Sequence, residues 1–366
     1  MTRTLSRPEL IAWTRLARTP RIGALTFHRL IARFRTASAA LEALPRVSTL
    51  SAPPEDRARA EIEGVEALGA RLIASGEPDY PPLLAQLDAP PPLIAVRGDA
   101  KWFKRPTVAI VGSREGSGSA LMFAERLATD LGAAGYTVVS GLARGVDAAA
   151  HRGALTTGTV GVLAGGLDHP YPPQNQKLHD AMCEQGAVIT EAPLGAAPRA
   201  RDFPRRNSII SGVSRGVVII EAALRSGSLI TARAAADQGR DVMAAPGSPL
   251  DPRARGSNAL IKQGATLIED ASDVITALGE GAPPLRPLSA GPLFDDIEAP
   301  APPPGLPKKI AALLSPTPIH VNDLARLVEA PAGVVAAALT ELELEGRAAS
   351  LPGGYAAQAR AAFAQD

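Results

Sequence analysis

The sequence predicts an α/β protein whose central domain is a doubly wound, mostly parallel sheet, with a small helical domain before it and a winged-helix domain after it. Short apolar runs alternate with helical stretches between residues 107 and 268, as expected for parallel strands covered by helices on both faces. Proline-rich stretches flank that region, and 366 residues are enough for two or three domains.

Residues 1–75 are expected to form the helical domain. Apolar side chains recur at helical spacing from Pro8, and Pro20 interrupts the pattern. Ser38 is expected to cap a third helix that ends before Pro45.

The turn from Pro20 to Gly23 is of a kind that can present backbone N–H groups to DNA phosphates. It has one glycine where such hairpins usually have two, so packing or a protein contact is the preferred interpretation of these helices. A further helix is predicted over residues 51–68, and residues 78–92, with six prolines, are expected to be an extended connector.

The central domain is expected to span residues 76–278. A first strand is predicted at Leu93–Val96, and its later strands at Val108–Val111, Thr137–Ser140, Val160–Leu163, Ala187–Thr190, Val217–Ile220, Val242–Ala244 and Thr266–Ile268. The intervening helices are predicted at Ser119–Ala133, Asp147–Leu155, Gln174–Glu184, Leu229–Gln238 and Asn258–Gln263. This alternation is typical of a doubly wound sheet.

Residues 279–306 are expected to be a semi-rigid proline-rich linker. Residues 307–366 then contain three short helical patterns and a possible hairpin at Arg347–Tyr355, which together predict a winged helix. The helix at Ala332–Glu345 has three Glu and no Lys or Arg, so it is poorly suited to contact phosphates. A protein-contact or regulatory role is therefore expected for this domain.

Composition narrows the function classes. The net charge is +1, so a basic binding site has to be local. Cys183 is the single cysteine, and the five histidines show no metal-binding spacing, so neither a disulfide nor a metal site is expected. No cofactor is predicted. No apolar run approaches a membrane span, and a soluble cytoplasmic protein is expected.

Three glycine-bearing loops follow consecutive strands of the predicted sheet. The first, Gly112-Ser113-Arg114, offers a tight turn, a hydroxyl and a guanidinium to a phosphate, although it matches neither the dinucleotide fingerprint nor a P-loop. The second, Ser140–Asp147, contains Arg144, and the third is Gly165–Asp168. Because ligands bind beyond the carboxyl ends of such strands, these loops predict an anion site.

Asp147 is expected to cap the helix that carries His151, and both residues are assigned supporting roles. Glu221, at the end of a later strand, is either catalytic or a residue that holds an arginine in place, and the second interpretation is preferred. No nucleophile, base and orienting group occur together, so no catalytic set is assigned.

A basic segment follows the third loop. Five arginines lie between residues 199 and 215, and Phe203 lies among them, a combination that suits single-stranded nucleic acid. Further along, Ser226-Gly227-Ser228 opens a helix whose N–H groups form a second expected anion cradle.

Six ordered motifs resemble those of the DprA/Smf DNA-processing family: VAIVGSR, SGLARGVDAAAH, GLDHPYPPQN, EAPLG, FPRRN and EAALRSGSLITARAAADQGRDVMAAPG. The resemblance covers roughly residues 78–268. More loosely, residues 1–75 resemble a sterile-alpha-motif-like module. The resemblance implies an extended Rossmann fold and sequence-independent binding of single-stranded DNA. It also implies protection of incoming strands and loading of the RecA recombinase during natural transformation, homodimerisation through the Rossmann domain, and no enzymatic activity.

The resemblance also places individual residues. Gly112, Ser113 and Arg114 are expected at the DNA phosphates. The same groove is expected to hold Phe203, Arg205, Arg206 and Asn207, and the motif leaves open which of the two arginines faces the DNA. Ser208 stands where the family often has a basic residue.

Two other function classes remain open. A nucleotide-processing phosphoribohydrolase is suggested by Glu221 with Arg233, although the Pro-Gly-Gly-x-Gly-Thr run of such enzymes is absent. A transcriptional regulator built on the C-terminal domain is disfavoured by the acidic helix at Ala332–Glu345.

Overall fold

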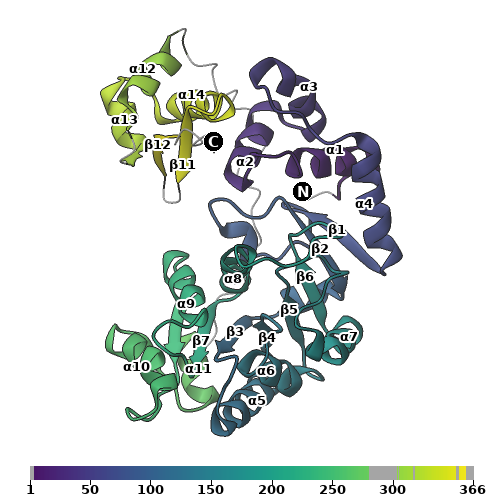
Figure 1. Ribbon diagram of the computed structural model, residues 1–366, viewed down its shortest axis with the longest axis vertical. Coiled ribbons are helices and arrows are strands. Elements are labelled where there is room, and N and C mark those ends of the chain that lie inside the picture. The colour runs from purple at the N-terminus through teal and green to yellow at the C-terminus, as the bar shows by residue number, and fades with distance from the viewer. Residues whose placement is uncertain (1–3, 280–302, 304, 316–317, 352–353, 360–366) are drawn as a thin grey trace, which may run out of the picture.

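The structure is a computed structural model, and it describes residues 4–279, 303, 305–315, 318–351 and 354–359 (Figure 1). An N-terminal helical domain lies between a central sheet domain and a C-terminal winged-helix domain. The predicted fold class is confirmed. The linker predicted over residues 279–306 falls almost entirely outside the described residues.

Four helices form the N-terminal domain: α1 (Arg7–Ala17), α2 (Ala24–Phe34), α3 (Ala37–Val47) and α4 (Glu55–Ala67). The cap predicted for α3 is wrong. Thr36 has an extended backbone and its side chain accepts the N–H of Ala39, whereas the Ser38 hydroxyl donates to the Glu9 carboxylate at 2.8 Å. The helix also continues past Pro45, where the proline removes a single N–H near the C-terminal end.

Nine strands form the central sheet, in the order β1-β2-β6-β5-β4-β3-β7-β8-β9. Their bounds are β1 (Ala70–Ala74), β2 (Leu93–Gly98), β3 (Thr107–Gly112), β4 (Thr137–Ser140), β5 (Thr159–Val162), β6 (Ala187–Thr190), β7 (Gly216–Ile220), β8 (Asp241–Ala244) and β9 (Thr266–Leu267). Strands β3 to β9 pair in parallel, and β2 joins β6 and β1 antiparallel. Strand β1 was not predicted from the sequence.

Helices cover both faces of this sheet: α5 (Gly118–Ala133), α6 (Val146–Ala154), α7 (Gln176–Gln185), α8 (Asp202–Gly212), α9 (Ser228–Asp237), α10 (Arg255–Lys262) and α11 (Ala271–Ala277). An apolar core lies on each face of the sheet, and alternate residues of β3 point into one or the other. Val108 and Ile110 pack in one apolar cluster with α5 and α6, and Ala109 and Val111 pack in another with α8 and α9. Short 3-10 turns lie at η1 (Leu84–Gln86), η2 (Ala100–Phe103), η3 (Pro173–Asn175) and η4 (Pro252–Ala254).

The direction of winding reverses at β3. The chain runs outward through β4, β5 and β6, then returns through α8 to β7, which pairs with the other edge of β3. In open α/β sheets, ligands bind in the crevice at such a reversal, beyond the carboxyl ends of the strands. The loops after β3, β4, β5 and β7 therefore surround the expected binding position.

The C-terminal domain is a winged helix, as predicted. It contains α12 (Leu306–Leu313), α13 (Val321–Leu327) and α14 (Ala332–Leu344), with a small sheet of β10 (Ile319–His320), β11 (Ala348–Leu351) and β12 (Tyr355–Gln358). The turn between β11 and β12 includes residues 352 and 353, which lie outside the described part of the chain.

Candidate nucleic-acid interface

Gly112 is required by a close approach between two strands. A Cβ atom at this position would clash with the carbonyl oxygen of Ile220 on β7. Ser113 donates its N–H to the same oxygen at 3.4 Å, and its hydroxyl accepts the N–H of Glu115 at 3.2 Å. The loop therefore uses much of its own polar capacity internally, while Arg114 is exposed.

Asp147 organises the loop after β4, but it does not cap helix α6 as predicted. Gly145, with φ of +77°, is the capping residue, and Asp147 lies in the first turn. Its buried carboxylate accepts the N–H groups of Gly141 at 3.1 Å and Ala143 at 3.4 Å. Burial raises the pKa of Asp147 against the opposing effect of Arg206.

His151 also stabilises the loop after β4. Its Nε2 accepts the N–H of Leu142 at 3.3 Å, and its Nδ1 lies 2.7 Å from the Thr159 hydroxyl. Burial, reinforced by the positive charge of Arg206, lowers the pKa of His151 to about 3. The imidazole is therefore neutral at physiological pH and adds no charge to the interface.

Arg206 is a buried cation, with 5% of its surface exposed. Its Nη1 donates to the carbonyl oxygen of Val162 at 3.0 Å and to that of Gly141. Burial lowers its pKa to about 10, so the guanidinium stays charged at neutral pH. Gly141 leaves room for it, since a Cβ atom there would collide with the guanidinium. This arginine holds α8 against the loop after β4 and the end of β5.

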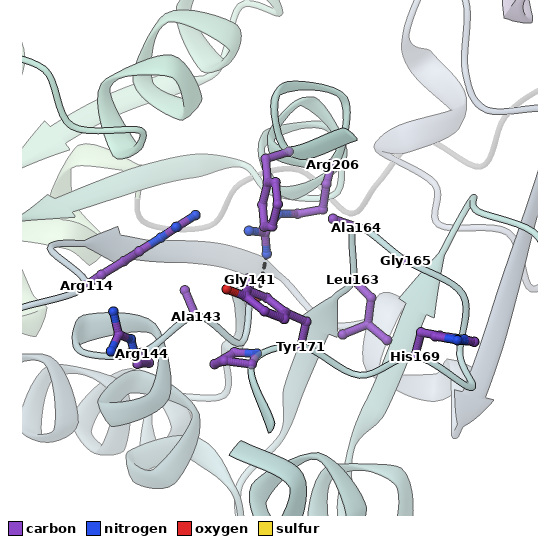
Figure 2. Close-up of a pocket in the computed structure, with 12 residues that line it drawn as sticks. Arg114, Gly141, Ala143, Arg144, Leu163, Ala164, Gly165, His169, Tyr171 and Arg206 are labelled. Atoms are coloured by element: carbon purple, nitrogen blue, oxygen red, sulfur yellow. Dashed lines mark hydrogen bonds between the residues drawn. The ribbon is translucent and has the colours of Figure 1, made fainter. Parts of the chain in front are cut away.

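Two guanidinium groups lie over the ring of Phe203. The Cζ atoms of Arg114 and Arg206 are 5.2 Å and 5.5 Å from its ring centroid. Tyr171 meets the same ring edge-on, at 6.1 Å between centroids, and is 51% exposed. Figure 2 shows Arg114, Tyr171 and Arg206 around one pocket, with Arg144 beside Arg114. Tyr171 was not predicted as a site residue, although an aromatic residue in the proline-rich GLDHPYPPQN motif was a usable signal.

The remaining FPRRN residues point in different directions. Arg205 is exposed and pairs with the largely buried Glu191, on the side of α8 that faces the N-terminal domain. Asn207 is buried, and its amide donates to the Gly227 carbonyl at 3.3 Å. Arg205 and Arg206 thus have separate surroundings.

Ser226-Gly227-Ser228 opens α9, as predicted, but the N–H groups of Ser226 and Ser228 have internal partners. Ser228 N–H donates to the Ser226 hydroxyl at 3.3 Å, and the next two N–H groups donate to the carbonyl oxygens of Ser226 and Gly227. Most N–H groups at this end of α9 therefore already have acceptors within the chain.

The hydrogen bonds of Glu221 fit a structural role. Its carboxylate accepts the N–H of Ser117 at 2.8 Å and the Ser117 hydroxyl, which ties the end of β7 to the start of α5. Its backbone φ is +51°, an uncommon conformation for a residue other than glycine. The nearest paired arginine is Arg253, at 3.9 Å, and the exposed Arg233 is not among its partners.

A second, larger groove of about 710 Å³ continues from the first pocket. The two cavities share Leu163, Ala164 and Arg206. The larger groove passes between α8 and the start of α2, and its arginines are Arg18, Arg199, Arg201, Arg205 and Arg206. In the described part of the chain, no cluster of side chains fits a metal ion, and no helix is long and apolar enough to cross a membrane.

Residues 71–279 match the family model described as DNA recombination-mediator protein A. The chain belongs to the DprA/Smf family. Residues 7–64 match a DprA-like N-terminal HHH domain, a different description from the sterile-alpha-motif-like module that the sequence suggested. Residues 297–354 match a DprA winged helix domain.

Relatives in the DprA/Smf family include Protein Smf of Escherichia coli, 39% identical over 79% of this chain and 78% of that protein. DNA processing protein DprA of Bacillus subtilis is 38% identical over 58% of this chain and 72% of that protein. The solved DprA of Streptococcus pneumoniae superposes with a TM-score of 0.61 at 30% identity, covering 75% of this chain and 98% of that one. Helicobacter pylori DprA, described for its single-stranded DNA binding mode, has a TM-score of 0.53 at 28% identity, covering 57% and 95%.

Proposed function

We propose that this chain binds single-stranded DNA without sequence preference and acts as a non-enzymatic recombination mediator. The observation that carries the proposal is the stack of Arg114, Phe203 and Arg206 beside the exposed Tyr171 at the carboxyl edge of the sheet. Charged forks and aromatic faces suit phosphates and unstacked bases respectively. The described binding mode of the Helicobacter pylori relative supports the same ligand class.

In this proposal, the exposed side chains contact DNA and the buried ones hold the site in place. Arg114 and Arg144 are exposed and take phosphates, together with polar groups of Gly112 and Ser113. Tyr171, and the open part of Phe203, take bases by stacking. Buried Arg206, with its two carbonyl partners, holds the platform and contributes its charge at short range. Neighbouring nucleotides then follow the second groove past the exposed Arg199, Arg201 and Arg205.

The finer functions expected from the family belong to the same proposal: protection of incoming strands, RecA loading during natural transformation, and a homodimer formed through the Rossmann domain. Exposed surface at the β9 edge of the sheet supports the proposed homodimer. Both residues of edge strand β9 are exposed, and Leu224, Ile230 and Leu250 add exposed apolar surface in neighbouring segments. Open strand edges and apolar patches favour association.

A gel-shift titration tests the proposal, with oligo-dT and a duplex of equal length at several salt concentrations. We expect preference for the single strand and an affinity that falls as salt rises, because phosphate contacts release counterions. Arg114→Ala should weaken binding and lower the slope of log affinity against log salt by about 0.7, the value for one contact on a single strand.

The matched control is Arg126→Ala, which removes an exposed arginine from α5 outside the cluster. Salt-independent binding, or an equal effect of the two substitutions, would contradict the proposal. Incubation with AMP tests the enzyme class: release of free base that Glu221→Ala abolishes would identify a phosphoribohydrolase instead.

A further inference from the structure

Helix α14 of the winged helix is docked on helix α2 of the N-terminal domain (Figure 1). Two ion pairs join them. Arg29 Nη1 lies 3.3 Å from the Glu343 carboxylate, and Arg33 Nη1 lies 3.1 Å from that of Glu341. The element that reads DNA in many helix-turn-helix proteins therefore faces a protein surface here.

The contact is more than a pair of exposed charges. The Glu343 side chain is only 10% exposed and that of Arg29 20%, and Arg29 Nη1 also donates to the Ser350 hydroxyl at 2.8 Å. Leu344, 2% exposed, belongs to the apolar cluster of the N-terminal helices. At the end of α14, a Cβ atom on Gly346 would lie 2.6 Å from the Arg21 guanidinium.

The charges of the two surfaces are complementary and of opposite sign. Helix α2 contains Arg29 and Arg33 and no acidic residue, whereas α14 contains Glu341 and Glu343 and no basic residue. Carboxylates and phosphates occupy the same fork of an arginine. The start of α2, at Gly23 and Ala24, also lines the larger groove that continues from the proposed DNA site.

We propose that α2 carries a second phosphate-binding face, and that α14 covers it with carboxylates in place of phosphates. Single-stranded DNA that follows the groove past α8 then competes with α14 for Arg29 and Arg33. The docking of α14 stands on its own contacts, while the competition by DNA rests on the function proposed above.

The test is an oligo-dT titration of the full chain carrying Glu341→Gln and Glu343→Gln. These substitutions free the two arginines without adding positive side chains. We expect tighter binding and a slope of log affinity against log salt that is steeper by about 1.4, since each contact on a single strand contributes about 0.7. Adding Arg29→Ala and Arg33→Ala should abolish the gain.

The matched control is Asp323→Asn with Glu345→Gln, which changes the net charge equally. These carboxylates pair with Arg326 and Arg347 inside the winged helix and leave the docked surface intact. A control that gains affinity equally, a Gln variant that gains none, or a gain that survives loss of Arg29 and Arg33 would each overturn the proposal.

Small-angle X-ray scattering tests the docking separately from DNA. Glu341→Lys with Glu343→Lys places like charges against Arg29 and Arg33, so we expect a larger radius of gyration. Restoration of the compact form by Arg29→Glu with Arg33→Glu would support the pairing, and a compact shape in the Lys variant would refute it. This measurement stays informative if Arg114→Ala shows that the proposed DNA site is wrong.

Discussion

Arg206 donates a hydrogen bond to the carbonyl oxygen of Gly141, 65 residues earlier in the chain. The bond joins the helix that crosses back to the centre of the sheet with the loop that follows β4. Gly141 accepts the guanidinium only because it has no side chain. The Arg–Phe–Arg stack of the interface depends on this junction, since Phe203 and Arg206 lie on the same turn of α8.

Replacing Arg206 with Ala should destabilise the fold by about 3–5 kcal/mol, because it leaves the buried Asp147 carboxylate without its nearby positive charge and two carbonyl oxygens without a donor. Arg206→Lys should recover part of the loss, because a lysine keeps the charge but not the fork. Urea denaturation measures both. Arg201→Ala serves as the control, since that side chain is 77% exposed and its loss should cost less than about 1 kcal/mol. Similar costs for Arg201 and Arg206 would contradict the assigned role.

Tyr171→Leu should weaken oligo-dT binding about 5- to 150-fold, equivalent to roughly 1–3 kcal/mol for one stacked base. The salt slope should stay unchanged, because stacking releases no counterions. This combination separates an aromatic contact from the loss of an arginine. Tyr355→Leu, in the winged helix and also exposed, is the comparison. A changed salt slope in Tyr171→Leu would show that the ring acts through Arg114 or Arg144 instead.

Gly112→Ala should cost about 1–3 kcal/mol, because the new methyl group meets backbone atoms of β7 that cannot rotate away. Gly118→Ala offers the opposite case. Gly118 begins α5 with open space around its Cα, so alanine should be neutral or stabilising by up to about 1 kcal/mol. Thermal melts of both variants measure the difference, and an unperturbed Gly112→Ala protein would refute the close approach.

His151 should make stability fall as pH falls. Its pKa is about 3 in the folded protein, below the ordinary 6.5, so between these values the unfolded chain binds the proton more readily. The contribution of His151 to the free energy of unfolding is fully present above about pH 7. Below pH 6.5 it decreases by up to about 1.4 kcal/mol per pH unit. The free energy of unfolding, measured by urea denaturation between pH 4 and 8, should depend less on pH for His151→Gln than for wild type.

The central strands of the sheet were predictable because they are short, continuous apolar runs that are buried on both faces. Val108–Val111 and Val217–Ile220 are examples, and they pair directly in the sheet. Helix α8 was missed because its apolar side chains, Ile209 and Ile210, come late and are preceded by Pro204 and two arginines. Its helical state is decided by packing against the sheet, which a local pattern does not report.

The order of the domains, the parallel sheet, the three glycine-bearing loops and the basic segment around Phe203 could all be predicted from the sequence alone. These follow from residue type and spacing along the chain, which act locally. Only the tertiary structure decided that Arg206 turns into the protein while Arg205 stays exposed, because burial depends on segments far apart in sequence. The same holds for α14: its glutamates were visible in the sequence, but their partners, Arg29 and Arg33, lie about 300 residues earlier and become neighbours only when the domains pack.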